Sequence, residues 1–163
     1  RSGKKVFQIT DTVGAVAAGM IADMNILMRE VTAHTKILQL ETNQPVPPNS
    51  IAKLMGLIMY QQKWFPMMTQ IILAGVENSK PAVYVLDPLG SVIPDEYATV
   101  GTGAELAIGV VESEYKQNLT EQEAVDLAIK SIRSAVNRDV SSGDGIDLLI
   151  VTENEIREQS VKT

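Results

Sequence analysis

The order of the predicted helices and strands is the feature that most constrains the fold of this chain. The expected order is two strands (5–11 and 13–18), two helices (about 20–38 and 51–64), four strands (69–76, 82–86, 92–93 and 97–100), two helices (104–115 and 121–137) and a last strand (146–151). Because the helices arrive in adjacent pairs, the pattern excludes an alternating parallel-sheet fold. We expect two helical layers packed on the outside of stacked sheets, within one domain over 1–163.

The first strand carries a lysine on its more apolar face. Lys5 alternates there with Phe7 and Ile9, while Lys4 points the opposite way. Because a buried ammonium is costly unless it is paired, Lys5 should have a carboxylate within reach. The candidates are Asp11, Asp139, Asp144 and Asp147. In the alternative interpretation, which composition alone favours, Lys5 lies at a strand end and extends its ammonium to solvent.

The two helices of the first pair differ in their apolar surfaces. In the first, residues at helical spacing predict one apolar side, made of Met20, Met24, Leu27, Met28, Val31, Thr35 and Leu38. The second follows the proline-containing break at 43–50, where Ser50 can cap it, and runs to about Trp64. It is apolar on several sides, so it needs two packing partners. These are its own sheet and a neighbouring subunit or, equally well, elements of one chain.

Two short motifs predict local structure. Asp87-Pro88-Leu89-Gly90 has the residues of a type I turn, with Asp first, Pro second and Gly fourth. Thr120 and Glu123 have the spacing of a capping box, which predicts the start of the last helix.

Composition and charge exclude several classes of function. With a formal net charge of -6, the chain has no overall field that would attract nucleic acid or an anionic membrane. No apolar run reaches the roughly 20 residues that span a bilayer. The chain has no cysteine and one histidine, His34, so neither a metal site nor a cofactor is predicted. The lack of cysteine also fits a reducing, cytoplasmic location.

Three glycine-containing loops lie at the ends of predicted strands, at 18–19, 101–103 and 138–145. Glycine lets a backbone amide approach a ligand closely, and a helix that begins at Gly19 directs unpaired N–H groups at whatever lies there. Such an amide could donate to an oxyanion. Glycines before helices are nevertheless mostly structural, and that interpretation stays open on this feature alone.

Several segments together resemble the β subunits of proteasomes, most closely archaeal ones. They are Gly3-Lys4-Lys5-Val6-Phe7, Ala17-Ala18-Gly19, Tyr97-Ala98-Thr99-Val100-Gly101-Thr102-Gly103 and Arg138-Asp139-Val140-Ser141-Ser142-Gly143-Asp144-Gly145-Ile146-Asp147, with further similarity at 64–66 and 87–90. The similarity is collinear and covers essentially the whole chain. Its most specific parts are the last loop and the strand that contains Lys5.

The resemblance implies an N-terminal-nucleophile hydrolase of the α+β class. Two stacked antiparallel sheets between two helix pairs would form a four-layer α-β-β-α sandwich. Subunits of this family form heptameric rings, with β rings inside and α rings outside, and they cut unfolded proteins within a closed chamber. The implied partners are therefore other β subunits, α subunits, protein substrates and a regulatory ATPase that acts through the α ring.

The nucleophile that the resemblance implies is an N-terminal threonine exposed by propeptide removal. Its own amine or a water acts as base. The chain opens on Arg1-Ser2 and enters a strand pattern at once, without an initiator methionine or a signal peptide. We read this start as missing protein, and expect the threonine and an acidic residue after it to belong to strands absent from this sequence.

The matched positions carry the family's other catalytic roles. The resemblance assigns the catalytic lysine to Lys5, whose charge would lower the pKa of the threonine hydroxyl. Its supporting aspartate falls on Asp139 and a supporting serine on Ser142. Thr102 replaces the other supporting serine and keeps a hydroxyl there. Gly19 matches the backbone donor to the oxyanion.

The resemblance also implies the pocket for the residue that precedes the cut. Ala17 and Ile21 match its walls, and Phe7 is expected nearby. Small Ala17 beside Ile21 predicts a roomy apolar pocket, and hence cleavage after hydrophobic residues.

Two other assignments compete with a catalytic β subunit. One is a structural or unprocessed β subunit that supports the ring without cutting. The other is an outer-ring α subunit, which has no use for the combination of Lys5, Asp139 and Ser142. Because a structural subunit need not keep all three residues, their presence favours the catalytic assignment.

Overall fold

The computed structural model describes residues 3–137 and 145–162. In chain order the elements are β1 (Val6–Gln8), β2 (Val13–Gly19), α1 (Ile21–Thr42), α2 (Pro48–Gln61), β3 (Thr69–Glu77), β4 (Lys80–Leu86), β5 (Val92–Asp95), α3 (Ala104–Glu114), α4 (Glu121–Val136), β6 (Gly145–Val151) and β7 (Ile156–Lys162). The predicted arrangement of paired helices between groups of strands is confirmed.

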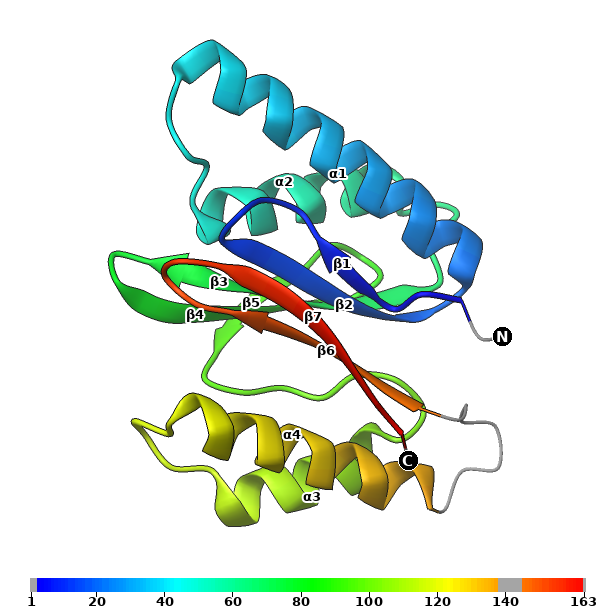
Figure 1. The fold of residues 1–163 in the computed structure, drawn as a ribbon. Helices are drawn as coiled ribbons and strands as arrows, with labels where there is room; N and C mark the ends of the chain where they lie inside the picture. The colour runs from blue at the N-terminus through cyan, green and yellow to red at the C-terminus, as the bar shows by residue number, and fades with distance from the viewer. Residues whose placement is uncertain (1–2, 138–144, 163) are drawn as a thin grey trace.

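Two antiparallel sheets lie between two helical layers. The first sheet has the strand order β1-β2-β3-β4-β5, and β6 pairs with β7 in the second. Figure 1 shows α1 and α2 on one side of these sheets, with α3 and α4 on the other. The predicted α+β fold, with stacked antiparallel sheets between two helix pairs, is confirmed.

Strand β2 has a different packing partner on each face. Its alternate residues Val13, Ala15 and Ala17 are buried in the main apolar cluster, together with residues of α1 and α2. On the opposite face, a Cβ atom on Gly14 would lie 2.2 Å from the Leu149 side chain of β6. The close approach of β6 explains why small side chains suit this strand.

Helix α1 buries one side, as its pattern predicts, but over a shorter stretch. The buried residues are Met24, Leu27, Met28, Val31 and Thr35. Including Met20 and Leu38 on this side was wrong, because they are 54% and 41% exposed. Met20 precedes the helix as its N-cap residue, and the last turns of α1 rise away from the sheets (Figure 1).

Helix α2 begins earlier than predicted. Pro48 stands in its first turn, where proline is favoured because its fixed φ suits the helix and no N–H is required. Ser50 therefore lies inside the helix, and its predicted role as the cap was wrong. The helix ends at Gln61, so Trp64 follows it and is 82% exposed.

One predicted strand is absent and one observed strand was missed. Within the described residues, the segment 97–100 forms no strand. Its side chains engage α3 and its flanks instead, since Thr99 Oγ1 donates to the Ala104 carbonyl at 3.0 Å and the Tyr97 ring packs on Tyr115. Strand β7 was missed because its sequence has no clear alternation of apolar and polar residues.

Both short motifs form as predicted. The Gly90 amide donates to the Asp87 carbonyl at 3.0 Å, which closes the turn. At the start of α4, the Thr120 amide donates to Glu123 Oε2 at 2.8 Å, and the Glu123 amide donates to Thr120 Oγ1 at 3.2 Å. This capping box lowers the pKa of Glu123, first through the Thr120 backbone hydrogen bond and next through the charge of Lys116.

Candidate active site

Gly19, the last residue of β2, adopts a backbone conformation that requires glycine. Its φ is +131°, and a Cβ atom built on it would lie 1.9 Å from the Met68 carbonyl oxygen. The loop before β3 therefore presses directly on this residue. A glycine is needed after Ala18 because the main chain of Met68 approaches the main chain of Gly19 at this point.

The ladder hydrogen bonds fix the direction of the Gly19 amide. The Ala17 amide donates to the Lys5 carbonyl on β1's side, whereas the Met20 amide donates to the Met68 carbonyl on β3's side. Because amides along an antiparallel strand alternate between its two neighbours, the amide of Gly19 points toward β1. Strand β1 begins only at Val6, opposite Val16, so it does not extend along Gly19. Within the described residues, the amide is thus directed past the end of β1, toward the segment that contains Gly3.

Lys5 lies across from Ala17, with its carbonyl oxygen 2.9 Å from the Ala17 amide. Alternation puts it on the same face as Phe7, as predicted, and Phe7 packs against the main apolar cluster. The expectation that its ammonium is buried was wrong: Lys5 is exposed, because it precedes an edge strand. This exposure fits the alternative, a lysine at a strand end that reaches solvent.

The described carboxylates do not pair with Lys5. Of the four candidates, Asp147 accepts a hydrogen bond from Ser160 at 2.6 Å, and Asp11 is exposed. No ion pair between Lys5 and a carboxylate exists within residues 3–137 and 145–162. The neighbouring Lys4, which points the opposite way as predicted, pairs with Glu158 of β7 at 2.9 Å. Asp139, Asp144 and Ser142 lie outside the described residues.

The three predicted pocket residues belong to three elements, namely β1 (Phe7), β2 (Ala17) and α1 (Ile21). Ala17 is buried, Phe7 is partly buried and Ile21, the first residue of α1, is 44% exposed. A Cβ atom on Gly3 would lie 2.9 Å from the Ile21 side chain. The start of the chain and the start of α1 are therefore adjacent, and the apolar surface of Ile21 lies beside the edge that the Gly19 amide faces.

The Gly101-Thr102-Gly103 turn also reaches this end of the sheet. The Gly101 amide donates to Gln70 Oε1 at 3.2 Å, and a Cβ atom on Gly101 would lie 3.1 Å from that of Ala18. Gly101 has a φ of +98°, so the turn requires glycine at this position. Thr102 is exposed on the turn, next to the strand that ends in Gly19.

Two side chains that hold this region together were not predicted. Gln70 binds the Gly101 turn, and Asp23 of α1 accepts a hydrogen bond from the Met68 amide at 2.8 Å. The partners are 31 and 45 residues apart in the chain. No spacing rule connects residues so far apart. The one available signal was an acidic residue in the first turn of a helix without a side-chain cap.

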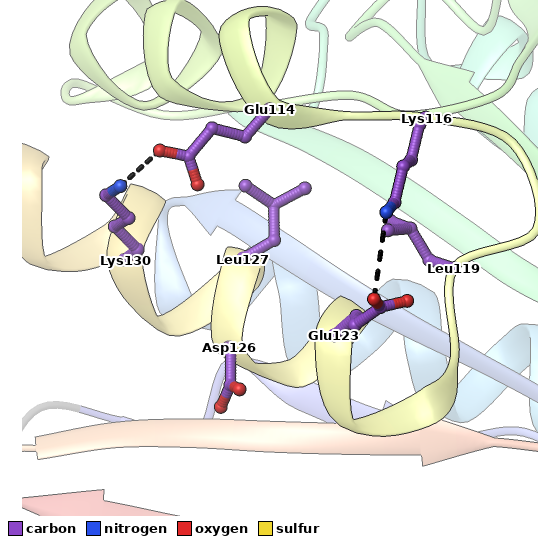
Figure 2. A pocket seen from close by; sticks show the side chains of 7 residues that line it. All are labelled: Glu114, Lys116, Leu119, Glu123, Asp126, Leu127 and Lys130. Atoms are coloured by element: carbon purple, nitrogen blue, oxygen red, sulfur yellow. Dashed lines mark hydrogen bonds and ion pairs between the residues drawn. The ribbon is translucent and has the colours of Figure 1, made fainter.

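A separate hollow of about 270 Å³ lies between α3 and α4, in the other helical layer. Figure 2 shows Glu114 directed at Lys130, and Lys116 directed at Glu123 with 3.7 Å between Nζ and Oε1. Its lining charges are therefore largely paired with one another. We do not include this hollow in the candidate site.

Among the described residues, no cluster of three or more histidine, aspartate or glutamate side chains could hold a metal ion. None of the helices there combines the length and the apolar character needed to cross a membrane. Near the end of β2 lie the Gly19 amide, the Lys5 side chain, Thr102 and the apolar surface of Ile21.

Comparison with known proteins places this chain in a family. A model of the proteasome subunit family matches residues 1–151. Proteasome subunit beta 1 of Nitrosopumilus maritimus is 50% identical over 158 residues, which cover 97% of this chain and 79% of that protein. Proteasome subunit beta 1 of Cenarchaeum symbiosum is also 50% identical, over 97% of this chain and 81% of its own length. Proteasome subunit beta 2 of Caldivirga maquilingensis is 38% identical over 99% of this chain and 81% of its own length.

Proposed function

Because this chain belongs to the proteasome subunit family, with archaeal β subunits as its relatives, we propose that it is a catalytic β subunit with threonine-type endopeptidase activity. The observation that carries the proposal is the amide of Gly19, which points past the end of β1 to the edge where Lys5 lies. An aimed amide and an ammonium at one edge are the groups that acyl transfer from a hydroxyl nucleophile requires.

The nucleophile in this proposal is an N-terminal threonine contributed by residues that precede Arg1 in the full-length protein. Its Oγ forms a bond to the carbonyl carbon of the scissile peptide, while its own amine or a water takes the hydroxyl proton. The carbonyl oxygen becomes an oxyanion that accepts from the Gly19 amide. The C–N bond then breaks, and the leaving amine takes up the proton. A water hydrolyses the resulting ester, which releases the carboxylic acid and restores the threonine hydroxyl.

Lys5 supports this chemistry through its charge. Lys5 is exposed and forms no ion pair with a carboxylate among the described residues. A positive charge stabilises the threonine alkoxide more than the neutral hydroxyl and so lowers the hydroxyl pKa. Asp139 and Ser142 are proposed to support Lys5 and the threonine, and Thr102 to contribute a second supporting hydroxyl. These three roles rest on the family resemblance.

We propose that cleavage follows hydrophobic residues. Ala17 contributes little volume to the pocket, and both Ile21 and Phe7 offer apolar surface at its edge. Fluorogenic peptides with leucine, glutamate or arginine before the scissile bond compare the three possibilities, and preference for either charged residue would refute the assignment.

The subunit is further proposed to assemble into rings with other β subunits and with α subunits, in the cytoplasm. Helices α1 and α2 expose large apolar side chains that an isolated chain would leave in water, namely Ile26, Ile37, Leu40, Leu57 and Tyr60. Such surfaces suit contact with neighbouring subunits. A closed chamber would limit the substrates to unfolded proteins, delivered by a regulatory ATPase through the α ring.

The test is N-terminal sequencing and intact-mass measurement of the full-length chain, alone and co-assembled with its α partner. A new N-terminal threonine that appears on co-assembly, together with hydrolysis of a fluorogenic peptide, supports the proposal. If the N terminus stays unprocessed, or begins with another residue, the chain is a structural β subunit and the catalytic proposal fails.

A further inference from the structure

We propose that Asp23 is a positioning residue for the oxyanion donor, one that holds the Gly19 amide in its direction by clamping the loop before β3 to the start of α1. The proposal rests on the proposed function, because it takes Gly19 as the donor. Asp23 itself would touch neither the substrate nor the nucleophile.

The clamp consists of two hydrogen bonds to a single residue. Asp23 Oδ2 accepts from the Met68 amide at 2.8 Å, and the Met68 carbonyl accepts from the Met20 amide at 2.7 Å. Both main-chain polar groups of Met68 are thus tied to the N-terminal end of α1, three residues apart. Met68 cannot shift without breaking one of these bonds.

Gly19 lies against the clamped residue. The Met68 carbonyl oxygen and carbon would be 1.9 and 2.9 Å from a Cβ atom on Gly19, so the two main chains are in direct contact. Gly19 also precedes Met20, which donates to that same carbonyl, and pairs in register with Thr69, the residue after Met68. The peptide of Gly19 is therefore bounded by Met68 on the side opposite to its amide.

Asp23 does not cap its own helix: its carboxylate accepts a hydrogen bond from Met68 and not from the N-cap residue Met20. An acidic residue at the third helical position commonly accepts from the amide of the N-cap residue, as Glu123 does from Thr120 in α4. In α1 the N-cap residue Met20 has no side-chain cap bond, and its amide donates to Met68 instead. Asp23 correspondingly accepts from Met68, 45 residues away. The carboxylate thus joins α1 to the loop that supports Gly19.

The experiment measures kcat and KM for a fluorogenic peptide with the full-length chain co-assembled with its α partner. Asp23→Ala removes the acceptor, Asp23→Asn keeps an acceptor oxygen without the charge, and Glu30→Ala is the matched control that removes an exposed carboxylate from the same helix. We expect Asp23→Ala to lower kcat about tenfold with KM within about twofold, because a small misalignment of an oxyanion donor acts on the transition state. Asp23→Asn and Glu30→Ala should stay within about threefold of the unchanged protein.

A second readout reports on Gly19 itself. A peptide aldehyde that forms a reversible tetrahedral adduct places an oxyanion at the donor, so its dissociation should be about tenfold faster from Asp23→Ala than from Asp23→Asn. Unchanged kcat and adduct lifetime in Asp23→Ala would overturn the proposal. An equal loss of kcat and of adduct lifetime in Asp23→Asn would also overturn it, because the charge of Asp23, and not its hold on Met68, would then explain the effect. If Asp23→Ala does not assemble, Asp23→Ser replaces it with the same expected results. Failure of the proposed function gives a different result: the unchanged protein would then neither remove its propeptide nor hydrolyse the peptide.

Discussion

The carbonyl of Lys5 accepts a hydrogen bond from the amide of Ala17 at 2.9 Å. Because the amides of β2 point alternately toward β1 and β3, this bond fixes the direction of every other amide in the strand. The amide of Gly19, two residues after Ala17, therefore points toward the side of β1, past the end of that strand. The lysine and the amide donor are therefore fixed relative to one another by main-chain bonds.

The backbone at Gly19 predicts that Gly19→Ala abolishes activity. A methyl group would collide with the Met68 carbonyl, and a φ of +131° alone costs an L-residue about 1–3 kcal/mol. We expect less than about one hundredth of the peptide hydrolysis of the unchanged protein, together with a lower unfolding temperature.

Gly109→Ala is the matched control for this substitution. Gly109 lies inside α3, where an added Cβ atom would meet nothing within 4 Å. Replacing it should stabilise the protein by about 0.5–1 kcal/mol and leave hydrolysis unchanged. Equal losses of stability and activity in both variants, measured by thermal unfolding and peptide cleavage, would contradict the account of Gly19.

A buried hydroxyl in α1 predicts a stabilising substitution. Thr35 is 1% exposed, and its Oγ1 has no hydrogen-bond partner in the described part of the chain. Thr35→Val keeps the shape and removes the unsatisfied polar group, so the free energy of unfolding should rise by about 1 kcal/mol. Urea unfolding of the full-length chain measures this change, and a decrease would show that the hydroxyl has a partner.

The capping box of α4 predicts a pH dependence. The pKa of Glu123 lies below its usual value in the folded protein, chiefly because the carboxylate accepts from the Thr120 amide. The stabilisation is therefore complete above the unfolded-state pKa, and it is lost as the pH falls through the lower folded-state pKa. Unfolding temperatures of the unchanged protein and of Glu123→Gln should differ at neutral pH and converge in acid. A difference that grows with acidity would have the wrong sign.

Local signals in the sequence predicted local structure well. The capping box needs only residues within one turn, and Thr120 and Glu123 form it as expected. The same kind of signal failed at Ser50, because Pro48 is a competing helix start two residues earlier. Strand β7 has few apolar residues, and its stability comes from pairing with β6 rather than from its own pattern.

The candidate site was predictable to the extent that it follows from strand alternation and glycine. Alternation put Lys5 on the face of Phe7, and the main-chain contact of Gly19 with Met68 fits the structural interpretation of the glycine before α1. The sequence left open whether Lys5 is buried or exposed, because its exposure depends on which elements cover the end of the strand. The contacts of Asp23 and Gln70 join segments distant in sequence, which only the folded chain brings together.

Adjacent lysines provide the most direct test of the central claim, that the end of β2 is the active site of a threonine peptidase. Lys4 forms an exposed ion pair with Glu158, of a kind that contributes about 0–1 kcal/mol, whereas Lys5 lies across from Ala17. The measurement is hydrolysis of a fluorogenic peptide by assembled Lys5→Met and Lys4→Met particles of verified subunit composition. The account predicts that Lys5→Met retains less than about one hundredth of the unchanged activity while Lys4→Met retains at least about half. Hydrolysis by Lys5→Met at the unchanged rate would contradict it.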